Sequence, residues 1–147
     1  MKTVWVTRSR PSADRFSDII RASGYKVINA PVIEVVPTNA LLPRKEFDAV
    51  VFLSAHAVRH ALENRYFNCR TIVSIGEATS KALETYDVKS EIADFPSTEG
   101  LFSYLKTRIP LGSTVLLVSG IGGREHLDAW LTEIGHIVMR WRVYRRI

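Results

Sequence analysis

The stretch VLLVSGIGGREHL, from Val115 to Leu127, contains the unit from which the fold is built. Four apolar residues predict a buried strand, three glycines in the next positions predict a tight turn, and the following residues predict a helix. Gly120 and Gly122 fit two positions of a dinucleotide-binding fingerprint, but Glu125 occupies the third, and no P-loop sequence is present. The stretch therefore does not predict a nucleotide site.

The same loop suits an anion of another kind. Glycines expose backbone amides, the start of the following helix carries partial positive charge, and Arg124 adds a planar guanidinium that fits carboxylate or phosphate. A plain tight turn between strand and helix explains the glycines equally well. From these residues alone, both interpretations stand.

Strand, turn and helix recur along the chain. The predicted strands lie at 4–6, 50–53, 71–73, near Val88 and at 115–118. The apolar faces of the predicted helices are formed by Phe16, Ile19 and Ile20; by Val58, Ala61 and Leu62; by Thr79, Ala82, Leu83 and Tyr86; and by Leu127, Trp130, Leu131 and Ile134. This alternation predicts an α/β fold, in which a parallel sheet carries helices on both faces.

In such a fold the turns after the strands meet at one edge of the sheet, where ligands of open α/β sheets bind. Hydroxyls, glycines and arginines dominate these turns, whereas the histidines are scattered and no metal-ligand spacing is present. The candidates are Thr7, Arg8, Ser54, Gly76, Thr79, Ser97, Thr98, Gly120, Gly122, Gly123 and Arg124. Ser54 lacks the nucleophile elbow of a hydrolase and is expected to cap a helix, with His56 in the first turn.

Two segments break the rhythm. Residues 27–36 exceed an ordinary strand and contain Pro31, which favours an edge or crossing segment. Residues 137–144 alternate Arg140 and Arg142 with apolar side chains, which predicts a strand with one solvated face. The two segments could pair as a connector between two lobes. The basic and aromatic residues of the second could instead stack on nucleic-acid bases, although no nucleic-acid motif accompanies them.

Composition sets outer bounds. The chain has 147 residues, 46% of them hydrophobic, which suffices for a folded core. It contains no apolar run long enough to span a membrane and no signal-peptide pattern. A single cysteine, Cys69, excludes an internal disulfide and favours a reduced, cytoplasmic setting. The net charge of +5 favours an anionic partner and leaves nucleic acid, acidic lipid and polycarboxylate open.

Seven motifs, in this order over the whole chain, resemble the uroporphyrinogen-III synthase family. They are VWVTRSRP, INAPVIEVVP, FLSAHAV, SIGEATSKAL, FPSTEGL, SGIGGREHL and RVYRR. The resemblance implies two flavodoxin-like α/β lobes joined by a two-stranded ladder, with the active site between them. It divides the chain into a strand and helix of a discontinuous first lobe (1–33), a complete second lobe (34–142) and the start of a return connector (143–147). The remainder of the first lobe is expected to be missing, so catalysis by the chain as given is expected to be weak or absent.

The family that the sequence resembles is a group of lyases in haem biosynthesis. It closes the linear tetrapyrrole hydroxymethylbilane into uroporphyrinogen III, inverting ring D and losing water without a cofactor. By this resemblance, Tyr144 is expected to be catalytic and to help the hydroxyl leave. The residues expected to bind the substrate are Thr7, Arg8, Ser54, His56, Gly76, Thr79, Ser97, Thr98, Ser119, Gly120, Gly122, Gly123 and Arg124. The acetate and propionate groups of the substrate suit the glycine loop and its arginine.

Two other functions compete with an active synthase. A non-catalytic module that binds a polycarboxylate or tetrapyrrole is the main alternative, and a nucleic-acid-binding domain is the third. If the chain is a synthase, we expect it to bind a small-molecule substrate and neither a nucleic acid nor a membrane. Residues 1–26 carry apolar side chains with no complete lobe to receive them, so self-association or complementation by a missing C-terminal half is expected.

Overall fold

The computed structural model describes residues 1–44, 46–63 and 68–147. The chain forms two compact units: unit 1 comprises Met1–Val36 and Arg146–Ile147, and unit 2 comprises Pro37–Arg145. The chain passes between them twice, within strand β3 (Val35–Pro37) and within strand β8 (Ile137–Arg146). The division into lobes that the family resemblance implies stays a prediction.

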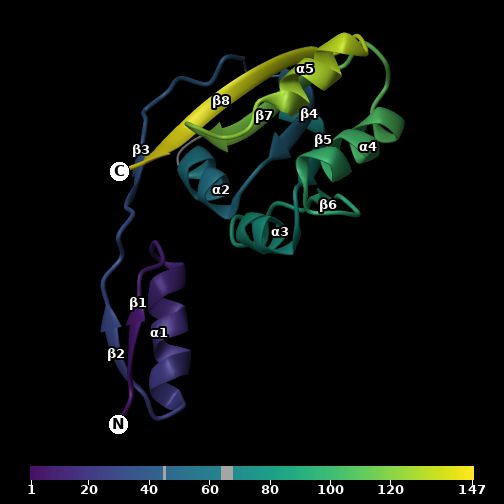
Figure 1. Cartoon of the computed structure of the whole chain (residues 1–147). Coiled ribbons are helices and arrows are strands. Elements are labelled where there is room, and N and C mark those ends of the chain that lie inside the picture. The colour runs from purple at the N-terminus through teal and green to yellow at the C-terminus, as the bar shows by residue number, and fades with distance from the viewer. Residues whose placement is uncertain (45, 64–67) are drawn as a thin grey trace. The chain divides into compact units, whose positions relative to one another are not determined.

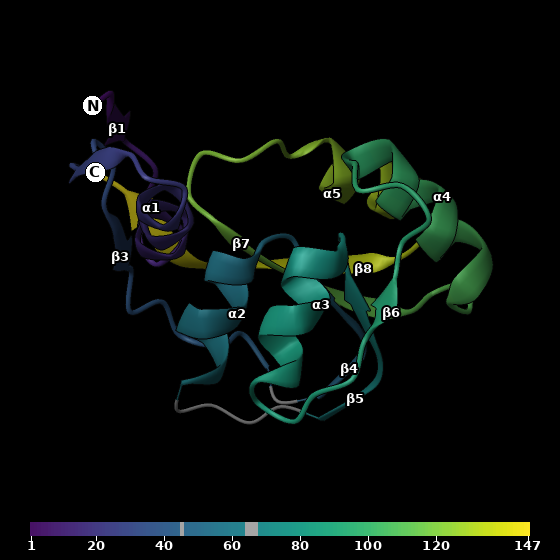
Figure 2. The same ribbon diagram turned by 90° about the horizontal axis from the view of Figure 1, so that it is seen from below.

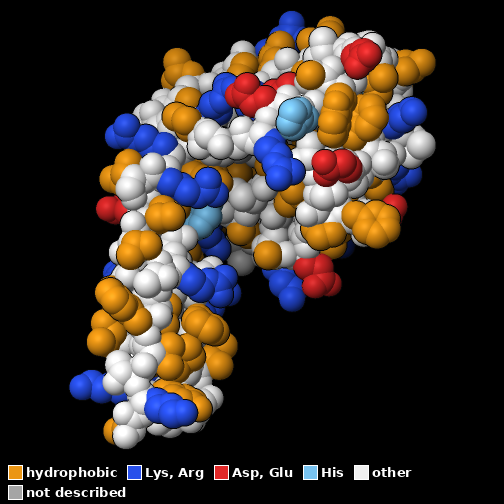
Figure 3. Space-filling view, in the orientation of Figure 1, with side chains coloured by type: hydrophobic (Ala, Val, Ile, Leu, Met, Phe, Trp, Pro, Cys, Tyr) orange, Lys and Arg blue, Asp and Glu red, His pale blue; other side chains and the backbone are white. Residues whose placement is uncertain are grey.

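Unit 1 is a small strand–helix–strand motif. Strands β1 (Thr3–Val6) and β2 (Lys26–Asn29) pair in parallel and are connected by helix α1 (Ser12–Ala22) (Figure 1). Gly24, with a φ of +84°, ends the helix as expected. The helix buries only Ala13 and Ser17. The apolar face predicted for it is largely exposed, and Figure 3 shows hydrophobic side chains gathered over these elements.

Unit 2 is built on a sheet in the order β3-β8-β7-β4-β5-β6. Its central strands are β4 (Glu46–Phe52), β5 (Asn68–Ser74) and β7 (Thr114–Gly120), and all pairings from β8 to β6 are parallel. The strand expected near Val88 is instead β6 (Glu91–Ile92). Val88 donates its amide to the Leu83 carbonyl at 3.1 Å, so it closes the preceding helix rather than beginning a strand.

Helices α2 (Ala55–Leu62) and α3 (Glu77–Glu84) lie side by side on one face of this sheet (Figure 2). Helices α4 (Thr98–Arg108) and α5 (His126–Glu133) cover the other face, where the core contains Ala49, Val51, Val73, Leu101, Leu105, Val115, Leu117, Leu127 and Leu131. The prediction that Tyr86 belongs to the apolar face of this helix is wrong, because Tyr86 lies beyond the end of α3 and is 37% exposed. No helix of the described chain combines the length and apolar character needed to cross a membrane.

The predicted α/β class, with a parallel sheet and helices on both faces, is confirmed. Counted from β4, the strand order of unit 2 is 3-2-1-4-5, because the chain first builds outwards to β6 and then returns to the other side of β4. The carboxyl ends of β4 and β7 therefore flank a topological switch point. In open α/β sheets, ligands bind at such a point.

The two segments that break the α/β rhythm meet through β3 and β8, which are neighbours in the sheet. Glu34 and Ile147 exchange two backbone hydrogen bonds of 2.9 Å, and the Thr38 amide donates to the Val143 carbonyl at 3.1 Å. Pro31 lies between β2 and β3, outside both strands, where it removes no ladder hydrogen bond.

Candidate active site

Tyr144 reaches the switch point because of an irregularity in β8. Ser119 pairs with Arg142, but Gly120 pairs with Tyr144, so Val143 is an extra residue in the ladder. Successive side chains of a strand alternate between its faces, so one extra residue moves every later side chain to the opposite face. Tyr144 therefore faces α2, whereas Arg142 faces α5. A strand that alternated strictly would place both side chains on the same face.

The phenol of Tyr144 packs against the start of α2. Its hydroxyl lies 3.0 Å from Oγ of Ser54, which also accepts a hydrogen bond of 3.0 Å from the Ala57 amide. Ser54 is thus the expected helix cap. The rings of His56 and His60 lie 5.6 and 5.9 Å from the phenol ring. Burial lowers the pKa of His60 below its ordinary value. Tyr144 is only 2% exposed.

Gly120 is required by the tyrosine ring. A Cβ on Gly120 would lie 2.5 Å from Cζ of Tyr144. Carbon atoms that are not bonded do not approach each other so closely, so no side chain fits at this position. The Ile121 amide donates to the Tyr144 carbonyl at 2.8 Å, which fixes the start of the loop. Gly122 has a φ of +84°, a conformation that favours glycine, whereas a Cβ on Gly123 would meet no atom closer than 3.9 Å. Two of the three glycines are thus needed for the structure of the loop itself, for reasons that do not involve a ligand.

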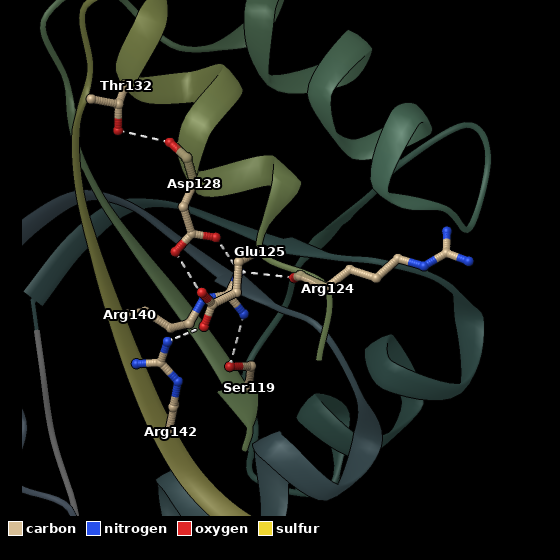
Figure 4. A network of polar contacts seen from close by, with 7 residues as sticks. All are labelled: Ser119, Arg124, Glu125, Asp128, Thr132, Arg140 and Arg142. Atoms are coloured by element: carbon tan, nitrogen blue, oxygen red, sulfur yellow. Dashed lines mark hydrogen bonds and ion pairs between the residues drawn. The ribbon is translucent and has the colours of Figure 1, made fainter. Parts of the chain in front are cut away.

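Arg140 joins three parts of the chain around this loop (Figure 4). Its Nε donates to Oδ2 of Asp128 at 2.8 Å, and Nη2 pairs with the other carboxylate oxygen. Nη1 donates to Oγ of Ser119 at 3.0 Å, and Nη2 also donates to the Arg124 carbonyl at 3.4 Å. The Arg140 side chain is only 5% exposed. The prediction of a solvated face is wrong here, because the first turn of α5 covers it.

Three arginines lie in or beside this loop, and Arg124 is the one whose guanidinium is available to an external anion. Arg142 forms an ion pair with Glu125, the residue before α5, and Arg140 is occupied by Asp128. The Arg124 guanidinium makes no hydrogen bond or ion pair with any residue in the described ranges, and Figure 4 shows its side chain extending away from the network. An exposed guanidinium beside backbone amides can bind a carboxylate.

The turns after β5 and β6 lie at the same edge of the sheet. A Cβ on Gly76 would lie 3.3 Å from Cβ of Pro96, so these two turns touch. Ser97 caps α4, because its Oγ accepts a hydrogen bond of 2.9 Å from the Gly100 amide. Thr98, half-buried, is the first residue of that helix. The structure thus brings the predicted residues of these turns to the edge that Ser54 and Gly120 share.

Four other candidates lie elsewhere. Thr79 is buried within α3, and Ser119 is buried within β7, where its hydroxyl is bonded to Arg140. Thr7 and Arg8 belong to unit 1, where they follow β1, and the Arg8 guanidinium lies 5.6 Å from the centre of the Phe16 ring. Neither buried hydroxyl presents itself to the surface of the edge.

Sequence reasoning missed His60 and Arg140 as site residues. His60 lies one helical turn after His56 on the helix that Ser54 caps, so this spacing could have found it. Arg140 and Asp128 are joined across the turn between α5 and β8, and no sequence spacing signals that contact. Among the described residues, no three His, Cys, Asp or Glu side chains gather closely enough to hold a metal ion.

A cavity of about 800 Å³ lies at the opposite edge, near the amino ends of β4, β5 and β7. Arg44 and Arg70 line it together with Glu46 and Asp48, so its charges are mixed. The Asp48 carboxylate already accepts a hydrogen bond of 2.7 Å from the Thr114 amide. Ligands of parallel sheets bind at the carboxyl ends instead, which favours the edge around Ser54 and Gly120.

Comparisons with known proteins agree on one family. A family model described as uroporphyrinogen-III synthase HemD matches residues 14–147. The uroporphyrinogen-III synthase of Salmonella typhimurium is 30% identical over 166 residues, and the match covers 98% of this chain and 65% of that protein. The synthase of Synechococcus elongatus is 28% identical over 162 residues, and the match covers 97% of this chain and 60% of that protein.

Solved structures show the same fold. A mutant uroporphyrinogen III synthase from Thermus thermophilus matches with a TM-score of 0.64 and 15% identity, over 100% of this chain and 63% of that chain. The uroporphyrinogen-III synthetase from Helicobacter pylori matches with a TM-score of 0.57 and 21% identity, over 99% of this chain and 61% of that chain. The chain thus spans less than two thirds of the length of these relatives.

Proposed function

The chain belongs to the uroporphyrinogen-III synthase family, and from this premise we propose that it acts in closing hydroxymethylbilane to uroporphyrinogen III. The reaction inverts ring D and releases water. The observation that carries the proposal is that Tyr144 and Ser54 meet at the switch point of unit 2, beside a loop whose Arg124 is exposed.

The substrate's charge matches this edge. Its acetate and propionate groups are anionic at neutral pH, and the chain has a net charge of +5. Arg124 and the backbone amides of the loop are proposed to bind these carboxylates. Ser97 and Thr98 add hydroxyls on the neighbouring turn. Much of the catalytic effect would come from positioning, since unguided closure joins the chain end to end without inversion.

Tyr144 and Ser54 are proposed to assist the departure of the hydroxyl. A hydroxyl has one proton to donate and two acceptor positions, and Ser54 already accepts from the Ala57 amide. If Tyr144 donates to Ser54, the Ser54 proton is free to reach the leaving oxygen, which departs as water. Tyr144 then reprotonates Ser54, and the proton released at ring closure restores the phenol. The half-buried Ser54 thereby connects the buried phenol to the edge.

The test is the isomer that the full chain produces from hydroxymethylbilane. We expect the inverted isomer III to form slowly but in excess of spontaneous closure, and Tyr144→Phe should lower its rate. Tyr104→Phe is the matched control, because the Tyr104 hydroxyl donates to Glu91 at 2.9 Å on α4, away from the switch point. Spontaneous isomer alone from a folded chain that still binds uroporphyrin would contradict catalysis and favour the non-catalytic binding module.

A nucleic-acid function is disfavoured by the ion pairs of β8. Arg140 and Arg142 are both paired with carboxylates of the α5 region, so they are not free to neutralise phosphates.

A small-molecule substrate in the cytoplasm remains our proposal. Burial raises the pKa of the Cys69 thiol, which keeps this cysteine in its protonated, less reactive form.

For unit 1 we propose self-association through its exposed apolar side chains. Trp5 is 67% exposed and Ile19 is 64% exposed, on a unit whose sheet has only two strands. Burial of such side chains against another chain is favourable at about 25 cal/mol per Å² of apolar surface.

A further inference from the structure

We propose that Arg140 is a positioning residue for the loop of residues 121–125, which it holds ready for an anionic ligand. The inference rests on the proposed function, in which this loop binds the carboxylates of a tetrapyrrole. Arg140 itself is not required to touch the ligand, since its side chain is almost fully buried.

The contacts of Arg140 explain how one side chain fixes the loop. The guanidinium presents five donors in a rigid fork, so it can hold several acceptors in one plane. Here its acceptors are Ser119 at the end of β7, the carbonyl of Arg124 within the loop, and Asp128 in the first turn of α5. The elements on either side of the loop, and the loop itself at Arg124, are thus tied to β8.

Helix α5 depends on this anchor because it lacks a side-chain cap. Ser54 and Ser97 cap α2 and α4 with their hydroxyls. The residue before α5 is Glu125, which makes no such cap and pairs instead with Arg142. The start of α5 is therefore held by strand arginines rather than by a local cap.

Arg140 also makes the electrostatic surroundings of the loop more favourable to an anion. Its contact with the Arg124 carbonyl turns that backbone inwards, and the Arg124 side chain extends outwards (Figure 4). Its pairing with Asp128 neutralises a carboxylate in the first turn of α5, where an unpaired negative charge would repel a polycarboxylate. Without Arg140, the loop would lose both its anchor and its favourable charge.

Arg108 and Glu91 provide a matched control. Nε of Arg108 lies 3.1 and 3.0 Å from the two carboxylate oxygens of Glu91, so this pair also ties a helix to a strand through a bidentate guanidinium. It joins the last turn of α4 to β6, outside the loop of residues 121–125. Arg108→Lys therefore makes the same chemical change without touching that loop.

The experiment compares Arg140→Lys with the parent chain, using uroporphyrin as the polycarboxylate probe. Lysine keeps the charge but cannot hold three acceptors at once. We expect the dissociation constant, measured by porphyrin fluorescence, to rise about fivefold or more. Amide exchange should accelerate at 121–125, by about tenfold, and remain unchanged at 115–118. Arg108→Lys should alter neither quantity.

Asp128→Asn repeats the test if the lysine variant does not fold, since it removes the anchor's charge while keeping a similar shape. Unchanged exchange and unchanged affinity would overturn the proposal. Acceleration spread evenly over unit 2 would also overturn it, because it would show a general structural role. If the parent chain binds no uroporphyrin but Arg140→Lys still loosens only 121–125, the positioning role stands and the proposed substrate fails.

Discussion

At the scale of single residues, Gly120 and Arg124 lie in one loop but are needed for different physical reasons. Gly120 is needed for space, since the ring of Tyr144 occupies the volume that a side chain would fill. Arg124 is needed for charge, since its guanidinium is exposed beside the backbone amides of the loop. One residue should therefore affect stability and the other binding.

Gly120→Ala should destabilise unit 2 by about 1–3 kcal/mol, because the new methyl group forces the phenol ring out of place. Urea unfolding measures this change. Gly123→Ala is the control, since its Cβ would have no neighbour closer than 3.9 Å. The cost at Gly120 should largely disappear when Tyr144 is also replaced by alanine. Equal stability of the two single glycine variants would contradict the packing account.

Arg124→Ala should weaken uroporphyrin binding by about 1.5–3 kcal/mol, the range for a charge-assisted hydrogen bond. Titration of porphyrin fluorescence measures it. Arg70→Ala removes the same charge from an exposed position at the opposite edge and should have little effect. If both variants bind equally well, Arg124 belongs to the solvated surface of the loop.

At the scale of secondary structure, the sequence predicts the repeating pattern well and its irregularities poorly. Apolar runs followed by glycine or serine turns locate β4, β5 and β7 and the helices after them. The extra residue at Val143 leaves no trace in the alternation of β8, yet it decides which face Tyr144 occupies. The alternation also makes Arg140 resemble a solvated strand residue. Periodicity describes a single strand, so it cannot show that α5 covers the Arg140 side chain.

Helix α2 adds a pH-dependent element, because it places His60 against the phenol of Tyr144. Burial lowers the pKa of His60, with Arg59 acting in the same direction and Glu63 opposing it. The unfolded chain therefore binds this proton more readily than the folded chain. Stability is full above the ordinary histidine pKa of about 6.5 and falls as the pH drops from there towards the lower pKa of the folded state.

His60→Gln should flatten this pH dependence, as measured by urea unfolding at about pH 7.5 and about pH 5.5. His126→Gln is the control, since His126 is exposed and stacks on Trp130 at 5.7 Å. An identical loss of stability in the parent chain and in His60→Gln would assign the pH dependence to other groups.

At the level of the whole molecule, the two units differ in the size of their hydrophobic cores. Among the described residues, unit 2 contains five of the six strands of its sheet and part of β3, with helices on both faces, whereas unit 1 is built on β1, β2 and α1. A two-stranded sheet with one helix buries little apolar surface and is marginal by itself. The assignment of the two units to complete and partial lobes of the family fold remains a prediction.

We expect the chain to self-associate through unit 1, or to hold residues 3–20 loosely while unit 2 stays folded. Sedimentation and amide exchange measure the two outcomes. Trp5→Ser should reduce association, whereas Leu111→Ser should not, although Leu111 is 82% exposed in a turn of unit 2. A monomer whose residues 3–20 are protected as strongly as 115–134 would contradict this prediction.

We propose above all that the carboxyl edge of unit 2 receives the tetrapyrrole polycarboxylate. The most direct measurement is an NMR titration of the full chain with uroporphyrin, following backbone amide shifts. We expect the shifts to concentrate after β4, β5, β6 and β7, at Ser54, Gly76, Ser97 and residues 120–124. Shifts concentrated instead at Arg44, Asp48 and Arg70, around the cavity at the opposite edge, would contradict this proposal.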